Sequence, residues 1–247
     1  MFFTSNCDAM RALPLVFDTF IFVQLLKTEN ISVLAKKIRP HQRQSIAAIV
    51  HGDIVLCSGS MISKSLILTS GVCIEEDRIS ELRIKFHGSR KFPVKKMKRS
   101  IDEKIAILLI KGSCILKRTA DVLDIVDWTY ATKLPGPVTL HSWTSGHPED
   151  DQFLDSVSFE LTKVQQSSCP KNMLTQKLDE HDLCARLSNG NMDIYRTGLY
   201  TIGAPIVQNG TLIGVASTFI DNSFVMYRNV RFLEIELKKM MEYLRKL

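Results

Sequence analysis

The feature of this 247-residue chain that most constrains its fold is a succession of short segments rich in Ile, Leu and Val, separated by turn-forming residues. Helical periodicity is nearly absent from these segments. They extend over residues 45–56, 60–69, 82–86, 92–97, 105–110, 138–143, 156–164, 204–207, 212–216 and 224–227. Apolar segments of this length and spacing are typical of β-strands, so the sequence predicts an all-β barrel or sandwich.

Turn residues inside this pattern predict where strands end. The dipeptides Gly52-Asp53 and Ser58-Gly59 break the first two apolar segments. Asn209-Gly210 lies between two later segments and predicts a tight antiparallel hairpin, because both residues tolerate positive φ.

The C-terminal residues 233–247 have the period of an α-helix instead. Leucine and methionine recur there three or four positions apart, with Lys and Glu between them, at Leu233, Leu237, Met240, Met241, Leu244 and Leu247. This pattern predicts an amphipathic helix that packs its apolar face on the body of the protein.

The six cysteines indicate disulfides rather than a metal site. They stand at Cys7, Cys57, Cys73, Cys114, Cys169 and Cys184. No CxxC pair and no His/Cys spacing suited to zinc occurs among them, and the histidines form no HExxH motif. We therefore expect no metal and no cofactor.

The N-terminal residues 1–35 are predicted to be a signal peptide or leader. Residues 13–26 are apolar apart from Asp18, Thr19 and Gln24, and Arg11 precedes them. A leader of this kind carries the chain to an oxidising compartment, where disulfides form. The apolar stretch is shorter than the roughly 20 residues that cross a bilayer, so we expect no stable membrane insertion. A buried helix and an uncleaved anchor stay open as alternatives.

The formal net charge of +6 is modest for this length, and nucleic-acid-binding motifs are absent, so we expect no nucleic-acid partner. Residues 90–99 nevertheless hold a basic cluster, which makes an anionic polysaccharide a candidate partner. Its six cations are Arg90, Lys91, Lys95, Lys96, Lys98 and Arg99. Regular strand alternation would turn Lys95 and Met97 to one face and Lys96 and Lys98 to the other, which divides the charge.

Several segments, taken in order, resemble one known family. Residues 57–63 (CSGSMIS) and 67–73 (ILTSGVC) have the spacing of the segment C-G-G-S-L-I-x-x-x-x-V-L-T-A-A-H-C of chymotrypsin/trypsin-type (S1 family) serine proteases. Residues 104–108 (KIAIL) resemble the family's D-I-A-L-L, and residues 203–207 (GAPIV) resemble the end of its G-D-S-G-G-P-L-V. The strand around the family's G-W-G resembles VTLHSWTSG at 138–146, and its V-Y-T-R-V resembles MYRNV at 226–230.

The resemblance covers about residues 45–247 and implies a trypsin-like double six-stranded antiparallel β-barrel with a C-terminal α-helix. It divides the chain into the leader at 1–35 and a protease-like domain at 36–247. Within that domain we expect the first barrel at 45–127, the second barrel at 128–232 and the helix at 233–247.

The same resemblance implies that the catalytic triad has been replaced. Val72 stands at the position of the histidine, Lys104 at that of the aspartate and Ile202 at that of the serine. Neither apolar side chain offers a proton acceptor or a nucleophile. Asp102 precedes Lys104 by two residues, and strand geometry would displace it by about 6.6 Å from the aspartate position, beyond hydrogen-bond reach. We therefore expect a protein that is not an enzyme.

Other positions of the family's site differ as well. Tyr200 replaces a glycine of the oxyanion hole, and Thr201 replaces the aspartate that pairs with the new N-terminus after zymogen cleavage. In the specificity pocket, Arg196 falls at the base, while Phe219 and Val225 replace glycines at the mouth and in the wall. The resemblance thus implies that the oxyanion hole, the activation switch and the pocket are all altered.

The family's disulfides carry over in part. The resemblance implies bridges between Cys57 and Cys73 and between Cys169 and Cys184, while Val138 and Gln208 occupy both positions of a lost bridge. Asn209 begins a glycosylation sequon on the predicted hairpin turn.

These features together favour a catalytically inactive, insect-like secreted protease homologue that acts by binding. Its expected partners are proteins of an extracellular fluid, such as other secreted proteases or their regulators, in an immune cascade or a seminal secretion. One alternative is a cationic effector that binds anionic polysaccharide or microbial surfaces. A remote alternative is an active serine endopeptidase that uses non-standard residues.

Overall fold

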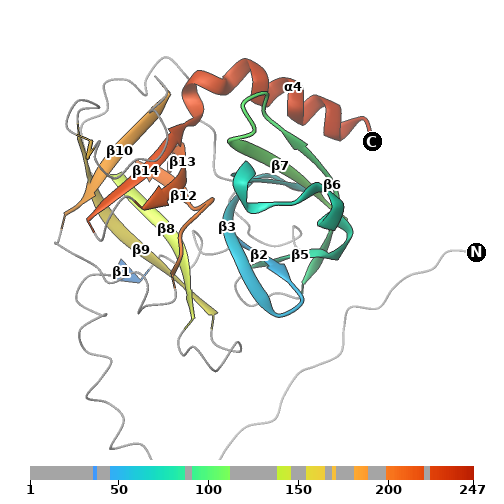
Figure 1. Ribbon diagram of the computed structural model, residues 1–247, viewed down its shortest axis with the longest axis horizontal. Coiled ribbons are helices and arrows are strands. Elements are labelled where there is room, and N and C mark those ends of the chain that lie inside the picture. The colour runs from blue at the N-terminus through green and yellow to red at the C-terminus, as the bar shows by residue number, and fades with distance from the viewer. Residues whose placement is uncertain are drawn as a thin grey trace, which may run out of the picture.

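Two antiparallel β-barrels lie side by side, and a C-terminal helix packs across them (Figure 1). The computed structural model describes residues 36–37, 45–86, 91–111, 138–145, 154–164, 169–170, 181–188, 199–219 and 223–247. The predicted fold of a double six-stranded antiparallel barrel with a C-terminal helix is confirmed.

The first barrel closes in the strand order β2-β3-β4-β7-β6-β5. Its strands are β2 (Ile46–His51), β3 (Ile54–Ser63), β4 (Leu66–Ser70), β5 (Leu82–Phe86), β6 (Phe92–Arg99) and β7 (Ile105–Ile110). Two 3₁₀ helices, η1 (Gly71–Cys73) and η2 (Glu76–Glu81), follow β4. Alternation sets the core, since Leu82, Ile84 and Phe86 of β5 point into the barrel and are buried.

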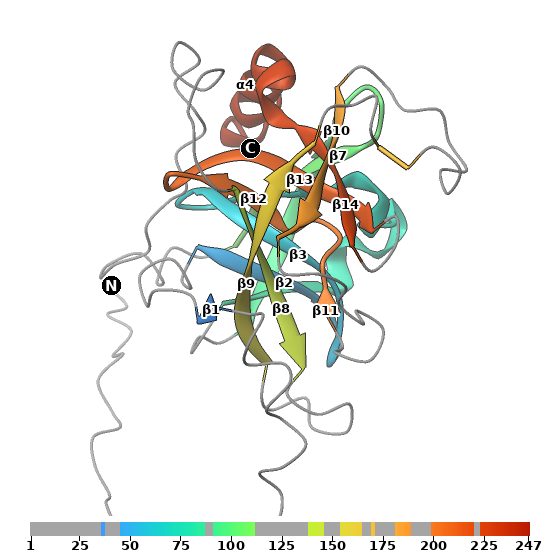
Figure 2. The same ribbon diagram turned by 90° about the vertical axis from the view of Figure 1, so that its left-hand side faces the viewer.

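The second barrel has the order β9-β10-β14-β13-β12-β8, and a further pairing of β8 with β9 closes it. Its strands are β8 (Val138–Ser145), β9 (Leu154–Lys163), β10 (Asp182–Leu187), β12 (Pro205–Gln208), β13 (Thr211–Phe219) and β14 (Phe224–Asn229). Two short strands extend this sheet, because β1 (Lys36–Lys37) pairs with β9 and β11 (Leu199–Tyr200) pairs with β8. Figure 2 shows β8 and β9 running side by side along this barrel.

The predicted strands correspond to observed ones, with two kinds of error. The predicted break at Ser58-Gly59 is wrong, because β3 continues through both residues to Ser63 and the turn comes at residues 64–65. A Cβ at Gly59 would lie 2.9 Å from Ile67 Cγ2, so this glycine allows β3 and β4 to approach closely. The sequence prediction also missed β1, β10 and β11.

The predicted hairpin and helix are both present. Asn209 and Gly210 have φ values of 51° and 81° and connect β12 to β13, as an Asn-Gly turn requires. After the 3₁₀ helix η7 (Val230–Leu233), helix α4 (Glu234–Arg245) buries Leu237, Met240 and Leu244. These side chains share one cluster with Leu66 and Ile107 of the first barrel and with Val207, Leu212 and Val215 of the second. The helix therefore ties the two barrels together.

A second apolar contact joins the two barrels. Trp143 of β8 is fully buried against Ile46, Ala48, Val50 and Val55 of β2 and β3.

In the described part of the chain, no helix is long and apolar enough to cross a membrane.

Candidate functional site

Three chain segments meet at the junction of the barrels, and each carries one of the predicted triad positions. Val72 lies in η1, Lys104 in the turn before β7, and Ile202 in the turn before β12. The backbone N–H of Gly71 donates to the carbonyl of Lys104 at 2.9 Å, and the N–H of Ser58 in β3 donates to the carbonyl of Ile202 at 2.9 Å. The structure therefore brings the three segments together, although they are far apart in sequence.

Glycine makes one of these close approaches possible. Gly203 has a φ of 80°, and a Cβ there would lie 2.2 Å both from the carbonyl oxygen of Ser58 and from Oγ1 of Thr69. Thr69 Oγ1 donates to that same carbonyl at 2.7 Å. The turn at residues 202–203 is thus pressed against β3 and β4, and this contact fixes the position of Ile202.

The two apolar side chains at the junction reach the surface. Val72 is 71% exposed and Ile202 is 37% exposed. Neither side chain has a polar atom, so neither can accept or donate a proton.

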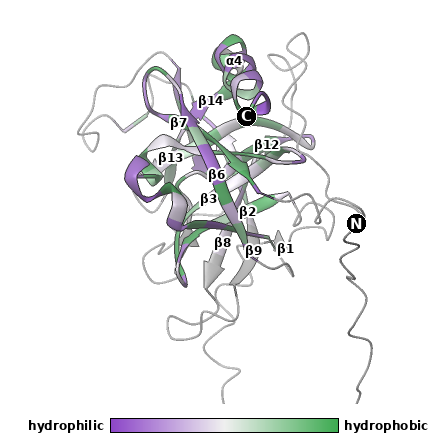
Figure 3. Cartoon of the chain, turned by 90° about the vertical axis from the view of Figure 1, so that its right-hand side faces the viewer, coloured by the Kyte–Doolittle hydropathy of each residue, from purple (hydrophilic) through white to green (hydrophobic). Residues whose placement is uncertain are grey.

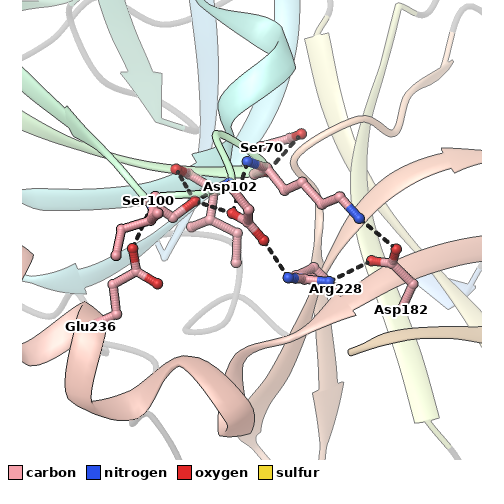
Figure 4. A network of polar contacts seen from close by, with 9 residues as sticks. Ser70, Ser100, Asp102, Asp182, Arg228 and Glu236 are labelled. Atoms are coloured by element: carbon pink, nitrogen blue, oxygen red, sulfur yellow. Dashed lines mark hydrogen bonds and ion pairs between the residues drawn. The ribbon is translucent and has the colours of Figure 1, made fainter. Parts of the chain in front are cut away.

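Lys104 is held across the junction by an acidic residue of the other barrel. Its Nζ lies 2.7 Å from Oδ2 of Asp182 in β10. Asp182 also accepts a hydrogen bond from Nη1 of Arg228 in β14 at 3.1 Å, and the two residues are direct partners in the β10–β14 pairing. Figure 4 shows Arg228 beside Asp182, both from the second barrel, whereas Lys104 comes from the turn before β7 of the first barrel.

Asp102 completes the network from the first barrel. Nη2 of Arg228 donates to Asp102 Oδ2, and Ser100 Oγ and the backbone N–H of Lys104 donate to Oδ1 at 2.6 Å and 3.1 Å. Partial burial raises the pKa of the Asp102 carboxyl, but these hydrogen bonds and the nearby charges outweigh it and hold the pKa below its ordinary value. The predicted strand displacement of Asp102 is wrong, because residues 101–104 form a turn and β7 begins only at Ile105.

The network balances two carboxylates with two cations, and its centre is buried. The side chains of Arg228 and Asp182 are 3% and 4% exposed, while those of Lys104 and Asp102 are 30% and 28% exposed. Two of its ion pairs, Lys104–Asp182 and Arg228–Asp102, cross from one barrel to the other. A buried charge persists only when it is paired, so these four residues depend on one another.

The other predicted site residues are distributed as follows. Thr201 is buried and its carbonyl accepts from the N–H of Ala204 at 3.0 Å. Tyr200 lies in β11 opposite Trp143. Phe219 and Val225 are direct partners in the β13–β14 pairing, and Val225 is fully buried in the core of the second barrel. Arg196 lies outside the described residues.

The structure contains both disulfides that the family resemblance implied. Cys57–Cys73 joins β3 to η1 and so anchors the segment that carries Val72. Cys169–Cys184 joins a loop residue to β10, two positions after Asp182. Val138 and Gln208 are direct strand partners, the geometry that two ends of a lost bridge require. Asn209 is exposed on its turn, and Cys7 and Cys114 lie outside the described residues.

Sequence reasoning did not single out Asp182 and Arg228. A weak signal for Arg228 is its position in the segment MYRNV, where a charged residue enters a strand that is otherwise apolar. Nothing in the sequence marks Asp182 as its partner. Among the described residues, no group of His, Cys, Asp and Glu is arranged to hold a metal ion.

Two closed antiparallel barrels, a C-terminal helix across them and a meeting of loops between them define a protein of the trypsin-like fold. The chain belongs to the trypsin family, since the model of the family described as "Trypsin" matches residues 33–223. No curated protein sequence matches the chain.

Solved structures of this fold are similar to the chain at low sequence identity. An inactivated protease paralogue of the scabies mite superposes with a TM-score of 0.71 at 20% identity, covering 85% of this chain and 99% of that one. Mouse neuropsin, a serine protease, gives 0.65 at 17% identity, with 84% and 98% covered. Human heparin binding protein gives 0.65 at 14% identity, with 84% and 96% covered. At these identities the likeness concerns the fold.

Proposed function

We propose that this chain is a catalytically inactive member of the trypsin family, which acts by binding other molecules. The observation that carries the proposal is the state of Lys104, whose Nζ is bound to Asp182 where the family places the triad aspartate. A cation there opposes the positive charge that a catalytic imidazole acquires when it takes the proton of the nucleophile.

The other two triad positions support the same conclusion. The family mechanism needs a nucleophilic oxygen and a base within hydrogen-bond reach of it. Val72 and Ile202 supply neither group at their exposed positions. Ser70 offers a hydroxyl nearby, but its Oγ lies within 3.4 Å of the carbonyl oxygen of Lys104 and donates to it.

The described histidines do not serve as a substitute base. His51 contacts Glu81 Oε2 at 2.5 Å, on the rim of the first barrel. His141 is buried in β8, and burial lowers its pKa to about 4. His181 precedes β10 and its carbonyl accepts from the N–H of Asn229. None of the three belongs to the segments that carry Val72, Lys104 or Ile202.

The substrate pocket supports a loss of peptide binding as well. Where the family has two glycines, the proposed equivalents Phe219 and Val225 lie opposite each other on β13 and β14. Both positions carry a side chain where the family has only a hydrogen atom, and Val225 is buried in the core of the second barrel. Arg196 at the base, Tyr200 at the oxyanion hole and Thr201 at the activation site complete the proposed set of altered positions.

We further propose that the protein is secreted, with residues 1–35 as its leader and 36–247 as the mature domain. Two disulfides in a family member agree with an oxidising compartment. Its partners are then proteins of an extracellular fluid, in the manner of the insect protease homologues, and Asn209 is an exposed position for a glycan.

The test is activity-based labelling of the protein purified from a secreting eukaryotic host. A fluorophosphonate probe reacts with the activated serine of a working protease, so we expect no labelled residue and no cleavage of casein or peptide substrates. Active trypsin, mixed into a parallel sample, is the positive control. Covalent labelling of any serine in this chain would refute the proposal.

A second candidate function is that of a cationic effector which binds anionic polysaccharide. The observation that favours it is the exposure of Lys95, Lys96 and Lys98 along β6. One solved structure of similar fold is named heparin binding protein. The test compares elution from immobilised heparin with elution from a sulfonate cation exchanger of equal charge density. We expect a higher salt concentration for heparin, and equal elution would contradict this function.

A further inference from the structure

An irregularity in β6 gathers its cations on one side. The pairing of β6 with β7 shifts register between Val94 and Lys96, so Lys95 is an extra residue without a partner across the ladder. Such a β-bulge turns the bulged residue out of the regular alternation. Lys95 and Lys96 are consequently both exposed, together with Lys98, while Met97 packs against the core. The predicted division of this charge between two faces is therefore wrong.

The C-terminal helix lies against the same strand. Nζ of Lys95 donates to the backbone carbonyl of Leu247 at 2.8 Å, and Nζ of Lys98 lies 5.5 Å from the centre of the Tyr243 ring. These contacts join the end of α4 to the second half of β6. Figure 3 shows hydrophilic colouring on both elements in this region.

Two further cations flank Tyr243 on the helix. Lys239 is one turn before it and Lys246 one turn after it, and positions three or four apart share a helix face. Both lysines are exposed, and so is half of the Tyr243 side chain. The β6–α4 face, defined as Lys95, Lys96, Lys98, Lys239, Tyr243 and Lys246, thus contains five cations and one aromatic ring.

Several surface cations outside this face are paired with acidic side chains. Arg78 pairs with Glu75, Lys91 with Asp53 and Lys238 with Glu234. Within the described residues, no acidic side chain pairs with any lysine of the β6–α4 face. The nearby carboxylate of Glu236 accepts a hydrogen bond from the N–H of Ile101 instead. Lys95 is bound to the backbone oxygen of Leu247, so Lys96, Lys98, Lys239 and Lys246 are the lysines available to an external anion.

We propose that the β6–α4 face binds a sulfated polysaccharide chain. Lys96 and Lys98 are about 6.6 Å apart along a strand, and Lys239 and Lys246 are about 10.5 Å apart along a helix. The two rows suit an extended polymer that carries an anion on each repeating sugar. The exposed ring of Tyr243 offers a flat apolar surface on which a sugar ring packs, a role for which an amphipathic aromatic is suited.

The inference deepens the second candidate function and is independent of the inactivity of the chain. Its test is calorimetric titration of the full secreted protein with a heparin oligosaccharide at physiological salt. The variants are K96Q/K98Q, K239Q/K246Q and the quadruple combination. The matched control is K64Q/R186Q, which removes the same charge from exposed positions elsewhere. Circular dichroism melting shows that each variant folds.

We expect the affinity to fall about tenfold in each double variant and about a hundredfold in the quadruple variant, because each exposed charge contributes modestly. The control should change it less than threefold. Desulfated heparin should bind at least tenfold more weakly than heparin.

Other outcomes separate the alternatives. If the wild-type protein binds heparin and the control variant weakens that binding as much as K96Q/K98Q does, the β6–α4 face is not the binding site. The second candidate function then stays in place. If the wild-type protein does not bind heparin, both the proposed binding site and the second candidate function are wrong. Tighter binding to a DNA duplex of equal charge than to heparin overturns the choice of polysaccharide.

Discussion

Replacing Asp182 with asparagine tests whether the buried ion network holds the two barrels together. The substitution keeps the shape of the side chain and removes one negative charge. Lys104 and Arg228, the latter 3% exposed, then each lose an ion pair with Asp182, while the ion pair between Arg228 and Asp102 stays. Breaking a buried pair from one side costs about 3–5 kcal/mol, and the remaining pair with Asp102 places the expected value near 3 kcal/mol. For a chain of this length, the midpoint of thermal unfolding should fall by about 6–12 °C.

The matched variant is K104M, which removes one cation at the partly exposed end of the same network. Lys104 is 30% exposed, and Asp182 keeps its bond to Arg228, so the cost should be about 1 kcal/mol. Urea unfolding followed by circular dichroism, with both disulfides intact, measures both free energies of unfolding. The reasoning fails if D182N costs less than about 1 kcal/mol, or if K104M costs as much as D182N.

Three further predictions concern single residues of the scaffold and the site. Burial lowers the pKa of His141 to about 4, so the unfolded chain binds the extra proton between pH 6.5 and pH 4. The free energy of unfolding should be unaffected above pH 6.5 and should fall by about 3 kcal/mol toward pH 4. The variant H141Q should remove this loss. If H141Q shows the same pH dependence as the wild-type protein, His141 is not its cause. Gly203 and Gly210 have similar positive φ values, but only a Cβ at Gly203 meets other atoms, at 2.2 Å; G203A should cost at least about 3 kcal/mol and G210A about 1 kcal/mol in urea unfolding, and equal costs would exclude steric crowding as the cause. The variant V72H/K104D/I202S restores the triad residue types yet brings a third carboxylate beside Asp102 and Asp182, so it should show no peptide hydrolysis above that of V72H/I202S, and a hundredfold gain would contradict this.

The sequence was sufficient to predict the fold, because the cysteine spacing and the motif order carry long-range information. The pair Cys57 and Cys73, with its flanking residues, implies two adjacent strands and the loop between them. Local signals were less reliable. Ser58-Gly59 has the composition of a turn, yet this glycine serves the close approach of β3 and β4. Strand β10 was missed because its sequence DLCARL mixes charged and apolar residues without a clear period.

The sequence did not predict the ion network at the junction or the arrangement of the β6–α4 face, and the reason is different. Lys104 and Asp182 are 78 residues apart, and Asp102 and Arg228 are 126 residues apart. Only the docking of the two barrels brings them within reach. The bulge at Lys95 likewise depends on how β6 pairs with β7, and no residue type near it signals an extra position. The sequence therefore shows which residues are charged, but it does not show which residue of another element is the ion-pair partner of each.

The ion network also explains why a binding function would move away from the junction of the barrels. A protease needs its cleft open and its loops able to accommodate a peptide, whereas here the loop before β7 is tied to the second barrel by two ion pairs. The surface left at the junction, Val72 and Ile202, is small and apolar. The β6–α4 face lies on the first barrel and the helix, where lysines are exposed without acidic partners among the described residues. The ion network at the junction and a charged binding surface elsewhere are compatible, because the network uses none of the lysines of the β6–α4 face.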